Sequence, residues 1–172
     1  TASALSTTQI ALTWQDLAAN EAGYKVQRAL SSTGPWVAIG STQTDQVTFT
    51  NSGLTPAMAY FYRVVATNTA GDSPPSNVAR ATTQADLTPP TVSITSPASG
   101  SVYTAAQAVT ISASAYDNVG VTRVEFYDGG ILKGTATASP YTFAWPVTGA
   151  SNGTHSWTAK AYDTANSSVS SP

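Results

Sequence analysis

The sequence predicts an all-β chain made of two small β-sandwiches joined by a short linker. Charged residues make up 9 % of the 172 residues, against roughly 25 % in an average soluble protein, whereas 41 % are hydrophobic. Large apolar residues recur at every second position in short segments, which 12 Gly and 10 Pro separate. This alternation is typical of strands with one buried and one solvated face. Because a sandwich of such strands needs about 100 residues, we expect two of them.

Turn residues bound the strands expected in the first half. These strands are residues 10–14, 24–28, 36–39, 60–67 and 77–82. In the first of them, Ile10, Leu12 and Trp14 point to one side. Turn formers at 32–35 precede the third strand, and a run of turn formers at 68–72 ends the fourth.

Four motifs in this half occur in a recognisable order and spacing. They are Leu12-Thr-Trp14, the segment 20–28, the segment 53–60 and the loop 68–76. Together they resemble a fibronectin type III domain over residues 1–84. The resemblance implies that Trp14 is a buried tryptophan on the second strand. It also implies that the Tyr60 hydroxyl bonds back to the backbone beside a buried Leu54.

Residues 85–90 are expected to form the linker. Pro89 and Pro90 remove two backbone donors and favour an extended, stiffened chain. A short linker of this kind predicts a restricted relative orientation of the two modules.

The second half has the same alternation in a different sequence. Its strands are expected at residues 91–95, 109–115, 121–127, 141–145 and 157–161, and Asp128-Gly129-Gly130 is a hairpin turn leading to Leu132. The motifs at 89–97, 117–121, 124–127, 140–145 and 159–163 resemble a bacterial immunoglobulin-like domain, here assigned to residues 91–172. The expected architecture is therefore two tandem immunoglobulin-like β-sandwiches. Both families' patterns should continue past the ends of this sequence, which predicts a piece of a longer polypeptide.

Several functional classes have no support in the sequence. A net charge of −2 without a run of Lys or Arg predicts no nucleic-acid partner, and no apolar run is long enough for membrane insertion. No Cys is present, and the single imidazole, His155, is expected to be a half-buried structural ring beside Trp157. No catalytic residues and no cofactor-binding residues are assigned.

The nine carboxylates raise the question of a glycosidase pair. Such a pair must flank a cleft, with one pKa raised by burial, and small sandwiches are expected to offer no cleft. The acids lie in predicted turns or on outward strand positions, where solvated charge is the ordinary interpretation.

One group of oxygen donors is different. Asp86 in the linker, Asp117 and Asn118 in one loop, and Asp163 in another are expected to converge, because the first strand of the second sandwich starts beside these two loops. Hard oxygen ligands from several segments are what Ca²⁺ requires. The sequence therefore indicates a calcium site at the junction of the modules that stiffens the joint. The alternative is that Asp117 and Asp163 cap turns through backbone amides.

The tryptophans raise the possibility of sugar stacking. Trp14, Trp145 and Trp157 fall on alternating strand positions and are assigned to the cores. Trp36 follows a turn and is the candidate ligand-stacking residue, expected to be exposed next to Tyr62 or Tyr24.

The resulting hypothesis is a monomeric, non-catalytic spacer and scaffold within a larger secreted bacterial protein, with adjoining domains of the same polypeptide as partners. The two resemblances imply a parent enzyme that degrades an insoluble polymer such as chitin. The alternatives are a module that binds an insoluble polysaccharide and a surface-adhesion module.

Overall fold

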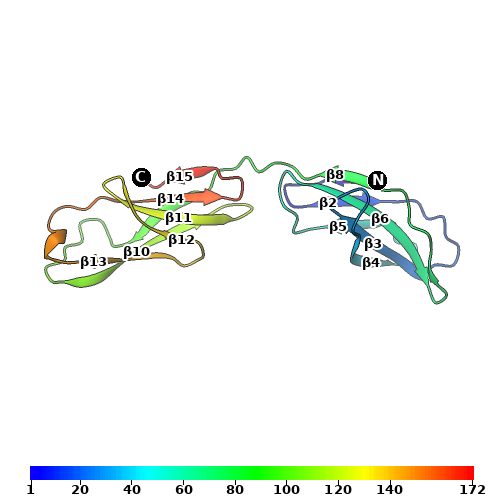
Figure 1. The fold of residues 1–172 in the computed structure, drawn as a ribbon, viewed down its shortest axis with the longest axis horizontal. Coiled ribbons are helices and arrows are strands. Elements are labelled where there is room, and N and C mark those ends of the chain that lie inside the picture. Colours follow the sequence, from blue (N-terminus) through cyan, green and yellow to red (C-terminus); the bar gives the residue numbers. More distant parts are fainter. The chain divides into compact units, whose positions relative to one another are not determined.

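Antiparallel strands account for both halves of the chain, and the all-β prediction is confirmed. The computed structural model describes residues 1–172 and divides them into two units, Thr1–Asp86 and Leu87–Pro172. Each unit is a sandwich of two sheets around its own core (Figure 1). The one helical element is the three-residue turn η1 (Gly149–Ser151).

The first sandwich packs a three-stranded sheet against a five-stranded one. The smaller sheet has the order β1 (Ala2–Ala4), β2 (Ile10–Thr13) and β5 (Thr48–Asn51). The larger sheet has the order β4 (Val37–Gln43), β3 (Gly23–Ala29) and β6 (Ala59–Asn68), and β6 also pairs with β7 (Gly71–Asp72) and β8 (Ala79–Thr82).

The core of the first sandwich follows the predicted alternation. Ile10 and Leu12 point inward from β2 against Val26 of β3, and all three are buried. At the corner before β6, the Thr55 N–H donates to the Tyr60 hydroxyl at 3.0 Å beside the buried Leu54. The bond that the resemblance implied for the Tyr60 hydroxyl is therefore present.

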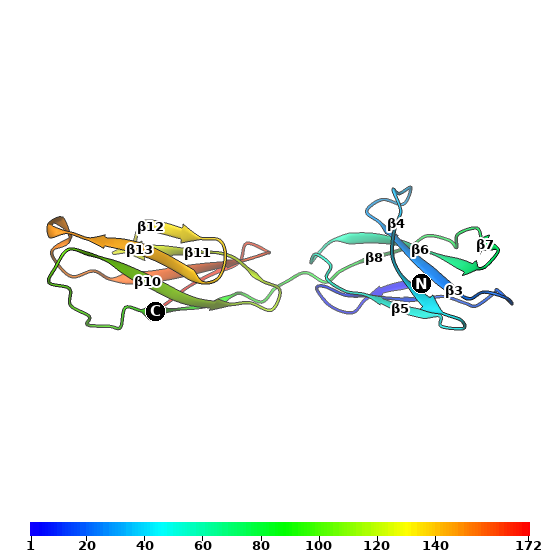
Figure 2. The same ribbon diagram turned by 90° about the horizontal axis from the view of Figure 1, so that it is seen from below.

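The second sandwich has the same two-layer plan. One sheet has the order β13 (Tyr141–Val147), β10 (Gln107–Tyr116) and β9 (Thr91–Ser96). The other has the order β12 (Ile131–Ala136), β11 (Val121–Asp128), β14 (Trp157–Asp163) and β15 (Ser168–Ser170). Figure 2 shows β10 beside β13, and β11 beside β12.

Alternating residues again fill the core of the second sandwich. Ile111, Val124 and Phe126 are fully buried. The expected hairpin joins β11 to β12 through Gly129 and Gly130, which have φ values of 56° and 83°. Glycine adopts such positive φ values without the steric cost of a Cβ.

Both sandwiches place an aromatic ring from one sheet directly over a glycine of the other. A Cβ on Gly40 of β4 would lie 2.7 Å from the Phe49 ring of β5. A Cβ on Gly134 of β12 would lie 2.3 Å from the Phe143 ring of β13. These glycines allow the two layers to close at the edge strands.

The strand prediction missed short polar segments. Strands β1 and β5 were not expected, because their residues carry little alternation and their pairing depends on β2 between them. Strand β4 begins one residue later than predicted and runs on to Gln43. None of the helices in the structure could span a membrane.

Candidate functional site

Two of the four predicted cation ligands lie together in the second unit. Asp117 directly follows β10, and Asp163 ends β14. Each offers a carboxylate oxygen, and these two oxygens lie within 4.8 Å of each other. Two separate loops therefore bring negative charge to one place. Asp86 is the last residue of the first unit.

These carboxylates are buried, which the sequence did not predict. The exposed fractions are 6 % for Asp86, 9 % for Asp117 and 2 % for Asp163, and Glu21 of the first sandwich is also buried. The expectation that all nine acids are solvated is therefore wrong. The physical reason is that the turns after β10 and β14 fold back over their first residues and bond to them.

Each loop uses only one oxygen of its carboxylate. Asp117 Oδ1 accepts the N–H groups of Val119 and Gly120 at 2.9 and 2.8 Å. Asp163 Oδ1 accepts the Ser167 N–H at 2.7 Å. The turn-capping interpretation thus holds for Oδ1, whereas Oδ2 of both residues is buried and accepts no hydrogen bond from the protein.

Asn118, the fourth predicted ligand, is exposed. Its side chain therefore differs from the three buried carboxylates, and its place among the ligands stays a prediction.

A second acidic cluster, which the sequence analysis did not identify, lies in the first sandwich. It consists of Asp16, Glu21 and Asp45, of which only Glu21 is buried. Asp16 Oδ1 accepts hydrogen bonds from the Tyr24 hydroxyl and from the Ala18 N–H. Burial, together with the hydrogen bond to Asp16, raises the pKa of Tyr24. Asp16 therefore has two donors from the protein, and both Asp16 and Asp45 are exposed to solvent.

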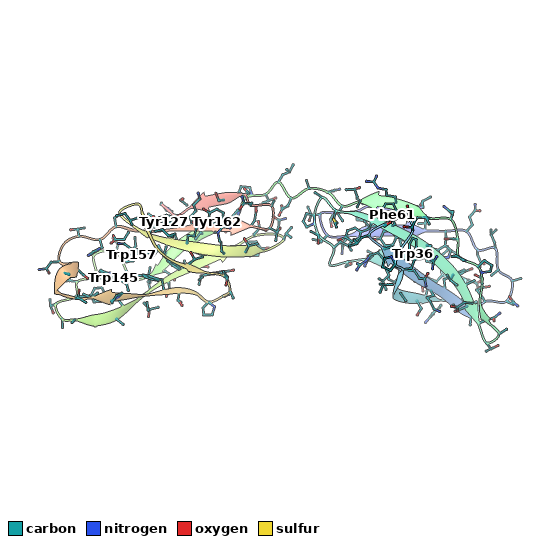
Figure 3. The ribbon with its side chains drawn as sticks, viewed as in Figure 1. Trp36, Phe61, Tyr127, Trp145, Trp157 and Tyr162 are labelled. Carbon is teal, nitrogen blue, oxygen red and sulfur yellow. The ribbon has the colours of Figure 1, made fainter.

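The second sandwich has a groove that the sequence did not predict. This groove of about 640 Å³ is lined by aromatic side chains, among them Tyr103, Trp145, His155 and Trp157. Trp145 and Trp157 pack edge to face with ring centroids 5.4 Å apart, and both border the core as assigned (Figure 3). No Asp or Glu lines the groove, so it lacks the acid pair of a glycosidase.

His155 lines this groove, and both of its ring nitrogens have a hydrogen-bond partner. Nδ1 lies 2.6 Å from Asp128 Oδ2, and Nε2 lies 3.0 Å from the Ser151 carbonyl oxygen. Because both partners are acceptors, only the imidazolium donates to both. The Ser151 carbonyl and then the Asp128 carboxylate raise the pKa of His155. The half-buried structural ring expected from the sequence is consistent with this geometry.

Trp36 is half-buried, and its surroundings differ from the prediction. The Arg63 guanidinium carbon lies 4.5 Å from the centroid of its ring and covers one face. Tyr62 and Tyr24, expected beside it on the surface, are buried in the interior. They alternate inward along β6 and β3, whereas Trp36 directly precedes β4, the edge strand of the same sheet.

A charged network on the outer face of β11 and β14 was missed by sequence reasoning. Glu125 accepts hydrogen bonds from Arg123 Nε and from the hydroxyls of Tyr127 and Tyr162. Burial alone would raise the pKa of Glu125, but these donors lower it, and the bond to Glu125 raises the pKa of Tyr127 to about 12. Arg123, Glu125 and Tyr127 occupy every second position of β11 and therefore share one face. This pattern in the sequence could have predicted the network.

Comparison with known proteins relates this chain to parts of two larger bacterial enzymes. Over 183 residues the chain is 36 % identical to Endoglucanase B of Cellulomonas fimi, a match that covers 99 % of this chain and 17 % of that relative. Exoglucanase B of Cellulomonas fimi is 33 % identical over 126 residues, covering 70 % of this chain and 11 % of that relative. The chain thus spans less than a fifth of either enzyme.

Among solved structures, the fibronectin(III)-like modules of CbhA from Clostridium thermocellum are similar to this chain. The identity is 23 % and the TM-score 0.46, over 98 % of this chain and 86 % of that one. The family models match residues 1–82 as a fibronectin type III domain and residues 90–159 as a bacterial Ig domain. The chain therefore consists of a fibronectin type III domain followed by a bacterial Ig domain.

Proposed function

We propose that this chain is a non-catalytic accessory segment of a secreted bacterial glycoside hydrolase. In this role the two domains are a spacer and scaffold that hold a neighbouring catalytic or binding domain of the same polypeptide. The observation that carries the proposal is the match to Endoglucanase B, which takes in 99 % of this chain but 17 % of the relative. The unmatched part of that enzyme is long enough to contain a catalytic domain.

The side chains also support a non-catalytic role. The large apolar residues fill two separate cores, and no Asp or Glu side chain lines the aromatic groove. His155, the single imidazole, is engaged by the Asp128 carboxylate and by the backbone carbonyl oxygen of Ser151, so neither ring nitrogen bonds to a Ser, Thr or Cys side chain. General acid–base hydrolysis needs two positioned carboxyl groups at one substrate site.

The polymer acted on by the parent enzyme belongs to the same proposal. The family resemblance named chitin as an example, whereas both similar enzymes are named as glucanases. These names favour a β-glucan as the substrate of the parent enzyme.

Incubation of the 172-residue chain with carboxymethylcellulose and with colloidal chitin tests the non-catalytic role. We expect no release of reducing sugar above buffer. Sedimentation with insoluble cellulose and chitin should leave the chain in the supernatant. Hydrolysis of either substrate would refute the proposal.

A second candidate function, carbohydrate binding, is favoured by the aromatic groove. Aromatic rings beside an open groove offer apolar faces on which sugars can stack. If the chain sediments with cellulose or chitin, Trp145→Ala and Trp36→Ala separate the two possible sites. Loss of binding in Trp145→Ala assigns the groove, and loss in Trp36→Ala assigns the edge of the first sandwich.

A further inference from the structure

The loops after β10 and β14 place the carboxylates of Asp117 and Asp163 side by side. Both residues are more than nine-tenths buried, and an oxygen of each lies within 4.8 Å of an oxygen of the other. Two carboxylates removed from water at such a distance repel each other strongly. Buried charges in proteins are otherwise paired or coordinate a metal ion.

Two buried carboxylate oxygens have no hydrogen-bond partner. Turn formation does not explain them, so they indicate a ligand. The bonds that hold the loops, from Val119, Gly120 and Ser167, all go to Oδ1 of Asp117 or Asp163. Oδ2 of each of these two residues is buried and accepts nothing. Neither residue forms an ion pair with Lys, Arg or His. The positive charge that these oxygens require must therefore come from outside the chain.

The spacing of the oxygens fits a large divalent cation. One oxygen of Asp117 and one of Asp163 lie within 4.8 Å of each other, so the point midway between them is within about 2.4 Å of both, in the 2.3–2.6 Å range of Ca²⁺–oxygen bonds. Zn²⁺ prefers nitrogen and sulfur ligands, and Mg²⁺ needs shorter bonds in a rigid octahedron. The donor set, all carboxylate oxygen, is the one that Ca²⁺ takes.

We propose that Asp117 and Asp163 bind one Ca²⁺ ion. Water and further oxygen donors complete its coordination. The ion neutralises the buried charge and joins the loops after β10 and β14 within the second sandwich. The ion is then part of the folded second sandwich. This inference does not depend on whether the parent protein is a glycoside hydrolase.

Isothermal titration of the full chain with CaCl₂, after treatment with EDTA and its removal, tests the site. We expect one ion per chain, with a Kd on the order of 10⁻⁴ to 10⁻³ M as in other extracellular modules. Asp163→Asn keeps the Oδ1 acceptor for Ser167 and removes the charge, so it should weaken binding at least about tenfold. Asp45→Asn removes one charge from the other acidic cluster and should bind like the unmodified chain.

Thermal unfolding separates loss of the ion from loss of the fold. At about ten times the Kd, Ca²⁺ should raise the melting temperature of the unmodified chain by roughly 5 to 10 °C. Asp163→Asn should melt no lower than the unmodified chain in EDTA, because one repelling charge is gone, and should gain almost nothing from Ca²⁺. MgCl₂ should give a smaller shift.

Four results would overturn the assignment. They are no heat and no melting shift in millimolar CaCl₂, an equal Ca²⁺ shift in Asp163→Asn, loss of binding in Asp45→Asn, and an equal shift with MgCl₂. The third of these would place the ion at Asp16, Glu21 and Asp45 instead.

Discussion

The two sandwiches share a plan but differ in how they treat buried polar groups. In the first, buried Asn51 accepts from the Tyr62 hydroxyl and from Arg28, and buried Thr83 donates to the Thr55 carbonyl. In the second, Asp117 and Asp163 each keep one buried oxygen without a partner. Each sandwich also buries one Trp indole N–H without an acceptor, at Trp14 and Trp157. The difference therefore lies in Oδ2 of Asp117 and of Asp163, two buried carboxylate oxygens of the second sandwich that have no hydrogen-bond partner.

This difference suggests a division of roles within one architecture. The fibronectin type III domain satisfies its buried polar side chains mostly from its own chain. In the bacterial Ig domain, Oδ2 of Asp117 and of Asp163 is buried without a hydrogen-bond partner, and a cation can neutralise these carboxylates. One sandwich is then expected to be indifferent to divalent ions, and the other to depend on them.

The largest effect is expected from removing a core ring of the second sandwich. Phe126 is fully buried among Val124, Ile111 and Phe143, so Phe126→Ala should cost about 3–5 kcal/mol of unfolding free energy. Because the cores are separate, the unfolding transition of the first sandwich should stay in place.

Chemical denaturation followed by tryptophan fluorescence measures both transitions of Phe126→Ala. A matched change in the first core, Val26→Ala, should move the other transition instead. If either variant shifts both transitions equally, the two cores unfold as one and the comparison fails.

Gly40 and Gly134, which lie beneath aromatic rings, allow the packing of the two sandwiches to be compared directly. A Cβ at position 134 would approach Phe143 Cδ2 to 2.3 Å, whereas one at position 40 would meet the outer ring atoms of Phe49 at 2.7 Å. Both Gly134→Ala and Gly40→Ala overpack their sandwich, at a cost of roughly 1–3 kcal/mol. Gly134→Ala should be the more destabilising, and urea denaturation of both variants checks the order.

Much of this architecture could be predicted from the sequence, but burial of charge could not. Strong alternation in residues 60–67 and 109–115 located the ends of β6 and β10 to within two residues. The short strands β1 and β5 were missed because pairing with β2, not local pattern, makes them strands. Tertiary pairing of this kind leaves little trace in a three- or four-residue segment.

The candidate cation site shows the same limit. Chain topology indicated that Asp117 and Asp163 would meet, and the structure places their carboxylates together. Their burial follows from turns that close over the carboxylates, which depends on bonds such as Ser167 N–H to Asp163. The groove beside Trp145 likewise depends on how distant loops pack, and alternation alone assigned that ring to the core.

A smaller effect is expected from the corner of the first sandwich. Tyr60→Phe removes the acceptor for the Thr55 N–H and should cost about 1 kcal/mol, because Thr55 is exposed and water can replace the lost bond. Thermal unfolding should show a shift confined to the first sandwich. An unchanged melting temperature would mean that this bond does not stabilise the corner.

The smallest effect is a pH dependence carried by His155. Its pKa is raised in the folded state by Ser151 and Asp128, so the charged ring stabilises the second sandwich below its unfolded pKa of about 6.5. This stabilisation is lost as the pH rises through the folded pKa.

In the presence of EDTA, the second sandwich should therefore melt at a higher temperature near pH 6 than near pH 8 (about one unit either side of neutrality). His155→Gln should reduce this dependence, while the first sandwich serves as an internal reference. A variant with the original pH dependence would show that another group is responsible.

Following the two unfolding transitions of the same sample by calorimetry, first in EDTA and then in CaCl₂, tests the contrast between the sandwiches most directly. Our account predicts that calcium moves the transition of the bacterial Ig domain to higher temperature and leaves that of the fibronectin type III domain where it was. Transitions that both stay fixed, or that rise together, would contradict it.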